Sequence, residues 1–378
     1  MLRREQSHLG YEDTINYGSY YTPGSVVSIV YDMLRKNIGN AAEYTVLDTS
    51  CGYGNFLVMP GSIGADCDKT ALAQAEKNTD NRRLFHHNSL KDVGRGQYGL
   101  GDSDKLIIVG NPPYNDTTSI IRNGIKRENC EIDPDLKHRD LGISFLLSYD
   151  KLAADYICVL HPLSYLIKKA NFEGLGKFKD NYSLIDSLVI SSGEFSATSK
   201  ATQFPIVIAL YKRGNGMTYD SICNHAFKTK DNKRFRIGQF DKLSNYITKY
   251  PNKNEKDFVA HFWTMRDINA LKRTRTFIEN EVYNSIRVPK GKLAFYCYAD
   301  VFKEYIPNIP YYFGNSDVMI DYPAFDRLRD AFVRKSLRKW GFLKHLAADY
   351  GDDNVSEDLL IHSYFKNLLG EHYVDKKD

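Results

Sequence analysis

The sequence predicts an α/β protein: a doubly wound, largely parallel sheet over residues 1–215, followed by a C-terminal α+β domain over residues 216–378. Segments typical of strands alternate with segments typical of helices in the first part of the chain. A stretch with two glycines and an asparagine, KRGNGMTYD at 212–220, ends this alternation. The 378 residues suffice for two cores, and 42% apolar with 26% charged residues is ordinary for a soluble globular protein.

Apolar, often β-branched runs identify the expected strands. They lie at residues 44–48, 62–68, 82–89, 105–110, 155–161, 183–192 and 204–213. The clearest helical segments lie between them, at residues 69–78, with Asp68 as the expected N-cap, and at residues 142–153. Strands that alternate with helices form a mainly parallel sheet with helices on both faces. Ligands of such sheets bind at the carboxyl ends of the strands, near the point where the strand order reverses.

The region after residue 215 differs in composition and charge. It is rich in Tyr, Phe, Lys, Arg and Asn, and shows little helical periodicity before residues 324–340. Residues 1–220 hold 24 basic and 26 acidic residues, a net −2, whereas residues 226–292 hold 16 basic and 7 acidic residues, a net +9. A positive surplus confined to one segment is expected for a polyanionic partner, although a solvated surface accounts for it equally well.

Four stretches of this region have distinct expected roles. Residues 228–236 and 271–277 place basic beside aromatic residues, as surfaces that neutralise phosphates do. Residues 327–340 combine an apolar stripe with a basic face, which fits either a helix that touches a nucleic-acid backbone or an ordinary amphipathic surface helix. The aromatic-dense residues 295–317 are expected to form the core of the small domain.

The cysteines and the N-terminal residues indicate in which cellular compartment the protein is expected. The six scattered cysteines form no CxxC pair and have no metal-ligand spacing, which predicts a reducing compartment and no metal site. The opening residues MLRREQSHLG lack the apolar core of a signal peptide. No apolar run approaches the roughly 20 residues of a membrane span. The sequence therefore predicts a soluble, cytoplasmic protein without a membrane partner.

The first candidate site follows the strand predicted at 44–48. The segment from Asp48 to Phe56, DTSCGYGNF, carries two glycines, which let the backbone turn sharply and approach a ligand. It lacks the third glycine of a dinucleotide-binding loop, which disfavours a pyrophosphate. A second acid, Asp66, ends the next strand and could accept hydrogen bonds from two ribose hydroxyls. Taken alone, these features fit plain topology better than a cofactor site. The following Pro60 leaves room for about one helical turn.

The second candidate site is the run LIIVGNPPYND at residues 106–116. Asn111 follows a strand that reads as buried, at the position where ligands of such sheets bind. The Asn111 side-chain oxygen and the carbonyl of Pro112, which has no N–H, are two rigidly held acceptors. Two fixed acceptors suit an –NH₂ group, and Tyr114 offers a flat face for a planar ring. The run therefore indicates a site that accepts two hydrogen bonds from the exocyclic amine of a stacked base.

These motifs, in this order, resemble the amino-methyltransferases that use S-adenosylmethionine, specifically the gamma-class DNA adenine N6-methyltransferases. The resemblance covers about residues 17–213 and includes GSYYTP at 18–23, DTSCGYGNF at 48–56, NPPY at 111–114 and GEFSATSKATQFPIVIALYKR at 193–213. It implies a Rossmann-like methyltransferase sheet with a C-terminal target-recognition domain. It also implies S-adenosylmethionine as the cofactor and a flipped adenine in duplex DNA as the substrate.

The same resemblance assigns roles to individual residues. The implied catalytic residues are Asn111, Pro112, Pro113 and Tyr114. The implied cofactor-binding residues are Tyr20, Thr22, Asp48, Ser50, Cys51, Gly52, Asp66, Asn88, Ser89 and Asn111. Among these, Thr22 would hold the methionine carboxylate, Asp66 the ribose, and Asn88–Ser89 would lie beside the cofactor adenine. Phe195 would pack on the flipped base, with Phe204 as the weaker rival.

Double-stranded DNA is the implied partner, and a cognate restriction endonuclease that shares the target site is a further potential partner. NPPY also occurs in enzymes that methylate a protein glutamine, whose carboxamide presents the same two hydrogens; the basic C-terminal segment counts against that substrate. N4-cytosine methylation is chemically adjacent, and an Asn before the prolines favours adenine. A DNA-binding subunit with a decayed cofactor fold is the third alternative, against which the intact Asp48, Gly52, Asp66 and NPPY count.

Overall fold

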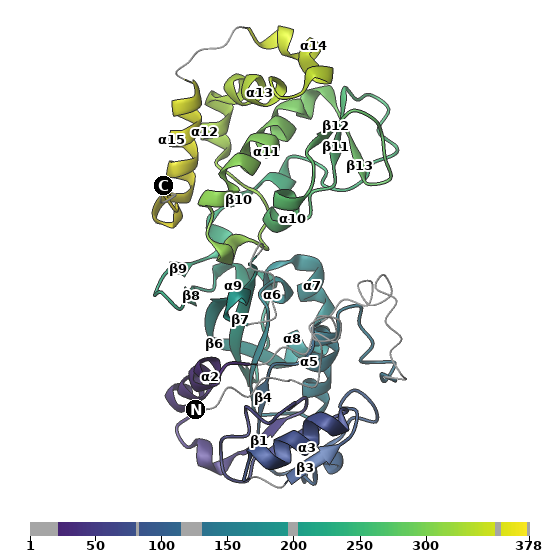
Figure 1. The fold of residues 1–378 in the computed structure, drawn as a ribbon, viewed down its shortest axis with the longest axis vertical. Coiled ribbons are helices and arrows are strands. Elements are labelled where there is room, and N and C mark those ends of the chain that lie inside the picture. The colour runs from purple at the N-terminus through teal and green to yellow at the C-terminus, as the bar shows by residue number, and fades with distance from the viewer. Residues whose placement is uncertain (1–21, 81–82, 115–130, 196–202, 352–356, 376–378) are drawn as a thin grey trace. The chain divides into compact units, whose positions relative to one another are not determined.

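The computed structural model describes residues 22–80, 83–114, 131–195, 203–351 and 357–375 (Figure 1). The chain divides into two compact units between residues 236 and 237. In the described residues, the first unit contains one large sheet flanked by helices, and the second contains two small sheets among helices.

A mixed α/β sheet with a mainly parallel centre forms the first unit, which confirms the predicted fold class. Within the described residues its strands are β1 (Thr45–Asp48), β2 (Ile63–Asp66), β3 (Arg83–His86), β4 (Leu106–Gly110), β5 (Tyr156–Pro162), β6 (Tyr182–Ser191), β7 (Pro205–Arg213), β8 (Phe227–Thr229) and β9 (Arg234–Phe235). They lie in the order β3-β2-β1-β4-β5-β7-β6-β8-β9. The neighbours from β3 to β5 are parallel, whereas β7 is antiparallel to both β5 and β6.

Burial explains why short apolar runs form these strands. All five residues of β4 and the last three of β1 are buried. The strands of a parallel sheet are covered on both faces, so they read as continuous apolar runs and not as an alternating pattern. This is the pattern from which the sequence predicted seven strands, and all seven are present.

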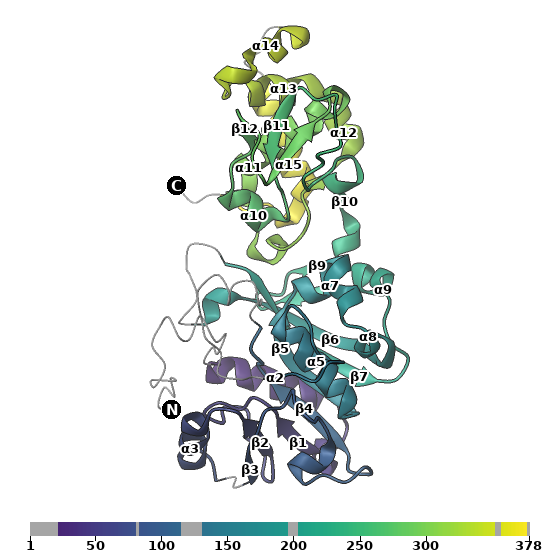
Figure 2. The same cartoon turned by 90° about the vertical axis from the view of Figure 1, so that its right-hand side faces the viewer.

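Helices flank this sheet. They are α2 (Gly24–Asn37), α3 (Lys69–Asn78), α5 (Leu141–Lys151), α6 (Ser164–Ile167), α7 (Lys169–Gly174), α8 (Lys177–Asn181) and α9 (Tyr219–Asn224). The prediction for α3 is confirmed: the Asp68 side chain caps it by accepting the N–H groups of Thr70 and Ala71 at 2.7 and 3.2 Å. The sequence did not predict α2, which packs on β5 and β7 (Figure 2).

The connection between β1 and β2 contains turns and not the helical turn for which the sequence left room. The Gly54 N–H donates to the Cys51 carbonyl at 2.8 Å, and the Leu57 N–H donates to the Gly54 carbonyl at 3.0 Å. The Tyr31 hydroxyl of α2 donates to the Phe56 carbonyl at 2.5 Å. Helix α2 therefore supports the glycine loop from outside.

The sheet continues beyond the boundary expected at residues 215 and 216. Strand β8 pairs in parallel with β6, and β9 pairs with β8, so residues up to Arg236 belong to the first unit. The stretch at 212–220 is a connection within this unit, because the Gly214 N–H donates to the Asn181 carbonyl at 2.8 Å and the Met217 N–H donates to the Lys179 carbonyl at 2.7 Å.

The second unit has the predicted α+β character. In the described residues its sheets pair β10 (Asp241–Lys242) with β14 (Met319–Ile320), and place β11 (Ala260–Trp263) between β12 (Phe277–Ile278) and β13 (Ser285–Val288). Its helices are α10 (Ile268–Arg273), α11 (Leu293–Tyr305), α12 (Tyr322–Arg327), α13 (Arg329–Leu337), α14 (Lys344–Ala347) and α15 (Glu357–Leu369). Across the described residues of the chain, no helix is long and apolar enough to cross a membrane.

Helix α11 corrects the prediction that this region lacks regular helices before residue 324. Nine of its thirteen residues are buried, including the aromatic side chains of Phe295, Tyr296, Tyr298 and Phe302. A helix that is apolar on nearly all sides lacks the one-sided pattern by which an amphipathic helix is recognised. The expected role of this aromatic-dense stretch as core is confirmed.

The helix predicted over 324–340 is interrupted at Leu328, which has φ −112° and ψ 11°, and so becomes α12 and α13. Its basic side chains pair with acids: Arg329 with Asp326, Arg334 with Glu357, Lys335 with Asp358 and Lys339 with Asp300. Of the two interpretations that the sequence allowed, these ion pairs favour the ordinary amphipathic helix.

Candidate active site

The strand order of the large sheet reverses between β1 and β4. From β1 the chain proceeds to β2 and β3 on one side, and then crosses to β4 and β5 on the other. Leu47 of β1 pairs with Ile108 of β4 in parallel, so Asp48 and Asn111 follow neighbouring strands at the same edge. Open parallel sheets bind ligands at such a reversal, outside the carboxyl ends of the strands. This edge is the candidate active site.

Asn111 and Thr22, 89 residues apart in the chain, are in contact at this edge. The Asn111 amide donates through Nδ2 to Thr22 Oγ1 at 3.1 Å. In this arrangement Nδ2 is the donor toward Thr22, and Oδ1 is the acceptor end of the amide. Oδ1 is buried, so an amine reaches it only after the surrounding chain opens. Pro112 is also buried, whereas Pro113 is half-buried.

Gly110 lets the Asp48 carboxyl lie against the backbone of β4. Its φ of 147° is a value that residues with side chains rarely adopt, and a Cβ there would be 2.7 Å from Asp48 Oδ1. The same oxygen accepts the Ser50 N–H at 3.1 Å. Burial raises the pKa of Asp48 to about 8, with a smaller contribution from the nearby charge of Asp66. A buried carboxyl therefore lies beside the backbone that leads into Asn111.

Asp66 supplies a second carboxyl at the end of β2. Its Oδ2 accepts the Gly52 N–H at 2.8 Å, and its Oδ1 accepts the Asp68 N–H at 2.9 Å. Burial raises the pKa of Asp66 as well, although these two hydrogen bonds oppose the rise. Each carboxylate oxygen has a second lone pair for a ligand hydroxyl. A positive charge brought to this edge would favour the ionised forms of Asp48 and Asp66.

The raised pKa of Asp48 gives a prediction for pH dependence. The native carboxyl, with a pKa of about 8, holds a proton that the unfolded chain, with a pKa of about 3.9, has released, so stability should fall as the pH rises between these values. We expect Asp48→Asn to remove this loss. The difference in Tm between pH 5 and pH 8 should shrink by about 5 °C or more relative to the parent. The exposed Asp102→Asn serves as the control, and an equal pH dependence in all three proteins would contradict the prediction.

The glycine loop contains one polar atom that fits a ligand and one side chain that does not. Within the described residues, the buried hydroxyl of Ser50 has no hydrogen-bond partner, although buried polar atoms normally have one. A polar ligand at the strand edge would satisfy it. The Cys51 side chain packs instead against Leu57 and Leu72, and burial raises the pKa of its thiol. The Cys51 side chain is therefore part of the core.

Asn88 and Ser89 follow β3 at the same edge of the sheet, on the side of β2. The Ser89 hydroxyl donates to the Thr49 carbonyl at 2.7 Å, which ties the loop after β3 to the end of β1. The Asn88 amide donates to the Glu131 carbonyl at 2.6 Å and accepts the Leu90 N–H at 3.0 Å. The backbone therefore orients the amide that the sequence placed beside the cofactor adenine.

Tyr114 is buried against the first turn of α5. A Cβ on Gly142 would be 2.9 Å from Tyr114 Cβ and 2.5 Å from the Tyr165 hydroxyl. The N-cap of the helix, Asp140, accepts the Gly142 N–H at 3.2 Å and the Tyr165 O–H. Sequence reasoning did not identify Gly142, Tyr165 or Asp140 as part of the packing at this turn. The one available signal was an Asp just before the helix predicted at 142–153.

The predicted stacking ring lies inside the protein in this structure. Phe195, at the end of a short 3₁₀ helix (Ser192–Glu194), is only 2% exposed. Phe204, just before β7, is half-buried, so a base could reach it with less repacking. Stacking by Phe195 stays a prediction. Tyr20, which the sequence assigned to the cofactor, lies outside the described residues.

A hollow of about 380 Å³ lies along α3 and β3. It is lined by Lys69, Leu72, Ala73, Glu76, Leu84 and His86. None of these residues belongs to the assigned catalytic or cofactor-binding set. The candidate site is therefore defined by the polar contacts at the strand ends and not by this hollow.

No protein-family profile and no curated protein matches this chain. Solved structures do show similarity. A provisionally described RNA methyltransferase of Pyrococcus horikoshii is 16% identical over 53% of this chain and 88% of its own, with a TM-score of 0.35. A provisionally described class I S-adenosylmethionine-dependent methyltransferase of Listeria monocytogenes is 18% identical over 53% of this chain and 62% of its own, with a TM-score of 0.38.

A third similar structure is the methyltransferase subunit of a type I restriction-modification system from Streptococcus thermophilus. It is 15% identical over 59% of this chain, with a TM-score of 0.39. This chain spans only 48% of that protein, less than two thirds of its length. At identities below 25% and TM-scores below 0.5, none of the three similarities indicates a function for this chain.

Proposed function

We propose that this protein is a site-specific DNA methyltransferase that moves a methyl group from S-adenosylmethionine to N6 of an adenine in duplex DNA. The observation that carries the proposal is the position of Asn111. It lies at the carboxyl end of β4, where the strand order reverses, and Thr22 orients its amide. Its Oδ1 and the Pro112 carbonyl are the two acceptors that an amine requires. We further propose that the enzyme belongs to a restriction-modification system with a cognate endonuclease.

S-adenosylmethionine fits the residues at the strand ends. Its ammonium and sulfonium groups are positive, and Asp48 and Asp66 are the carboxyls that such charges would help to ionise. The second lone pairs of Asp66 can accept ribose hydroxyls, and the buried hydroxyl of Ser50 needs a polar partner. The Thr22 hydroxyl accepts from Asn111, so its own hydrogen can be donated to a carboxylate.

The proposed reaction depends on how the amine is held. When bound, the cofactor supplies an electrophilic methyl group on its sulfonium sulfur. Asn111 Oδ1 and the Pro112 carbonyl would each accept one hydrogen of the adenine amine, which concentrates on nitrogen the lone pair otherwise delocalised into the ring. Both bonds strengthen as positive charge develops on nitrogen, so they stabilise the transition state more than the bound substrate.

The atoms and electrons balance without a prior deprotonation. With S-adenosylmethionine bound, the nitrogen lone pair would form the new N–C bond as the C–S bond broke, and the electron pair of that bond would remain on sulfur. The methylated nitrogen then releases one proton to water. Neither a nucleophilic cysteine nor a paired carboxylate is needed, which agrees with the burial of the Cys51 side chain in the core.

The target base must leave the duplex to reach this edge. Extrusion costs a few kcal/mol, and stacking on a ring such as that of Tyr114 recovers roughly 1–3 kcal/mol. Because Tyr114 and Asn111 Oδ1 are both buried in this structure, capture of a base requires the site to open.

The main alternative substrate is a protein glutamine, whose carboxamide presents the same two hydrogens. The net charge of +9 over residues 226–292 favours DNA, since a short peptide needs no such surface. N4-cytosine methylation would use the same two hydrogen-bond acceptors, but an Asn before the two prolines favours adenine.

Methyl-labelled S-adenosylmethionine tests the proposal when the protein is incubated with mixed plasmid DNA and, separately, with cell protein extract. We expect label in the DNA. If label enters protein alone, the substrate is a protein glutamine and not DNA. If neither DNA nor protein is labelled, the proposed methyltransferase activity is contradicted.

The exposed basic residues of the second unit give a prediction for DNA binding. Arg273 and Arg275 are exposed; Arg329 is exposed as well, but it is paired with Asp326. If both exposed arginines contact phosphates, the Arg273→Ala/Arg275→Ala double variant should reduce the slope of log affinity against log salt by about 2. Arg329→Ala should leave the slope unchanged. Fluorescence anisotropy of a labelled duplex measures both slopes, and equal slopes in the parent and the double variant would exclude these phosphate contacts.

A further inference from the structure

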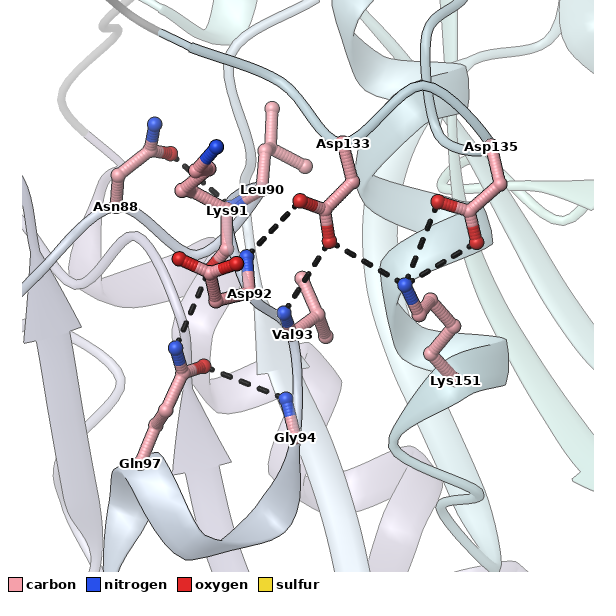
Figure 3. Close-up of polar contacts among 10 residues, drawn as sticks. All are labelled: Asn88, Leu90, Lys91, Asp92, Val93, Gly94, Gln97, Asp133, Asp135 and Lys151. Carbon is pink, nitrogen blue, oxygen red and sulfur yellow. Dashed lines mark hydrogen bonds and ion pairs between the residues drawn. The ribbon is translucent and has the colours of Figure 1, made fainter.

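The connection between β3 and the next 3₁₀ helix (Arg95–Tyr98) contains a loop from Asn88, which the resemblance places beside the cofactor adenine, to Gly94. Figure 3 shows this loop held from two sides. On one side, Asp133 Oδ1 accepts the Asp92 N–H at 3.0 Å and Oδ2 accepts the Val93 N–H at 3.3 Å. The Asp133 N–H also donates to the Leu90 carbonyl at 2.9 Å.

On the other side, the loop is held by Gln97. Its Oε1 accepts the Gly94 N–H at 3.3 Å, and its Nε2 donates to the Lys91 carbonyl at 3.2 Å (Figure 3). Between the two contacts, Asp92 has a φ of 52°, a left-handed conformation that is uncommon for residues other than glycine. A strained residue persists where its surroundings determine its conformation, and here the Asp92 N–H is held by Asp133.

We propose that Asp133 is a positioning residue that fixes the Asn88–Gly94 loop in the shape that receives the adenine of the cofactor. This inference rests on the proposed function. Asp133 acts through the loop, because it bonds to backbone groups of three loop residues. Two residues earlier in the chain, the Glu131 carbonyl accepts from the Asn88 amide. The segment that orients Asn88 is thus the one that Asp133 anchors.

The charge of Asp133 is stabilised in this position. The Asp92 N–H, followed by the Val93 N–H and the Lys151 ammonium, lowers the pKa of its carboxyl, and together they outweigh the opposing effect of desolvation. Lys151 Nζ lies 3.3 Å from Asp133 Oδ2 and 3.1 Å from Asp135 Oδ2. Asp135 shares the lysine, but its carboxylate makes none of the loop contacts in Figure 3. Variants of Asp133 and Asp135 can therefore distinguish the effect of anchoring the loop from the effect of pairing with Lys151.

Equilibrium dialysis with labelled S-adenosylmethionine tests the inference. The Asp133→Asn side chain can accept at most one of the two N–H groups, because its amide nitrogen is a donor. Without one of these charged hydrogen bonds, we expect the loop to adopt the receiving shape only about a tenth of the time, which lowers the apparent cofactor affinity by that fraction. Asp133→Asn should therefore bind the cofactor about tenfold more weakly, with kcat at saturating cofactor within about twofold of the parent. Asp135→Asn should match the parent in both.

Three results would decide against the inference or its premise. If the parent binds no S-adenosylmethionine, the proposed function fails. If the parent binds it and Asp133→Asn binds equally well, or if Asp133→Asn and Asp135→Asn lose affinity equally, the positioning role fails while the proposed function stands. Circular dichroism checks that the variants are folded.

A second variant keeps the test decisive if Asp133→Asn does not fold. Gln97→Ala removes the contact on the opposite side of the same loop. Gln97→Ala should also weaken the binding of the cofactor. It should reduce the preference in binding for S-adenosylhomocysteine over its inosine analogue, which differs only in the base. A Gln97→Ala protein with unchanged affinity and unchanged preference would overturn the assignment of this loop to the adenine.

Discussion

Replacing Asn111 with alanine is expected to lower the rate of DNA methylation by about 10²- to 10³-fold, the usual loss when one fixed polar group that stabilises a transition state is removed. The variant loses the Oδ1 acceptor, so one hydrogen of the amine is no longer held. Cofactor affinity should fall by less than about tenfold, because the hydrogen bond from Asn111 Nδ2 to Thr22 Oγ1 joins two neutral groups. Single-turnover methylation and cofactor dialysis measure the two effects separately.

Two further variants control this experiment. Asn111→Asp keeps an acceptor oxygen, and Thr22 can donate to it, so it should retain more activity than the alanine variant. Asn224→Ala, at the exposed end of α9, should behave as the parent. Methylation by Asn111→Ala at nearly the parent rate would show that Asn111 does not hold the amine.

Replacing Gly142 with alanine is the second change with a large expected effect. The new Cβ would be 2.5 Å from the Tyr165 hydroxyl and 2.9 Å from Tyr114 Cβ, and both tyrosines are buried. The Tyr165 hydroxyl ends its side chain, but the ring is buried and the O–H donates to Asp140, so the first turn of α5 and Tyr114 must move apart. Overpacking of this kind costs about 1–3 kcal/mol. We expect base capture to weaken by about 10- to 100-fold through the displaced Tyr114 ring.

The measurements on Gly142→Ala must distinguish a displaced Tyr114 ring from a general loss of folding. A duplex with 2-aminopurine at the target position reports extrusion of the base by fluorescence, and cofactor dialysis reports whether the strand ends are intact. Cofactor affinity should stay within about twofold, well below the effect of a broken hydrogen bond. Gly39→Ala is the matched control, because a Cβ there meets no atom within 4 Å. Equal fluorescence in the two variants would contradict the positioning of Tyr114 by α5.

The centre of the large sheet could be predicted because β1, β2 and β4 are short, largely buried and mostly apolar. Strand β4 is buried at all five residues, so residues 105–110 stood out in the sequence. The position of Asn111 then followed from the rule that ligands bind at the carboxyl ends of such strands. Strands β8 and β9 have only three and two residues, too few to show a pattern, so the expected domain boundary fell before them.

The side-chain contacts of the site could not be predicted in the same way. The bond between Asn111 and Thr22 joins residues 89 apart, and Asp133 holds the N–H of Asp92, 41 residues away. Such contacts depend on tertiary packing and leave no local pattern in the sequence. The basic face at 327–340 shows the opposite problem: the local pattern was clear, but acids from α11 and α15 neutralise much of it, as Glu357 does for Arg334.

The most direct test of the central claim is the identity of the methylated base. Plasmid DNA incubated with the protein and S-adenosylmethionine is digested to nucleosides and analysed by mass spectrometry. The two acceptors at the end of β4, with an Asn before the two prolines, predict N6-methyladenine as the product, and its loss with Asn111→Ala. N4-methylcytosine in its place, or unmodified DNA from a protein that binds the cofactor, would contradict the account.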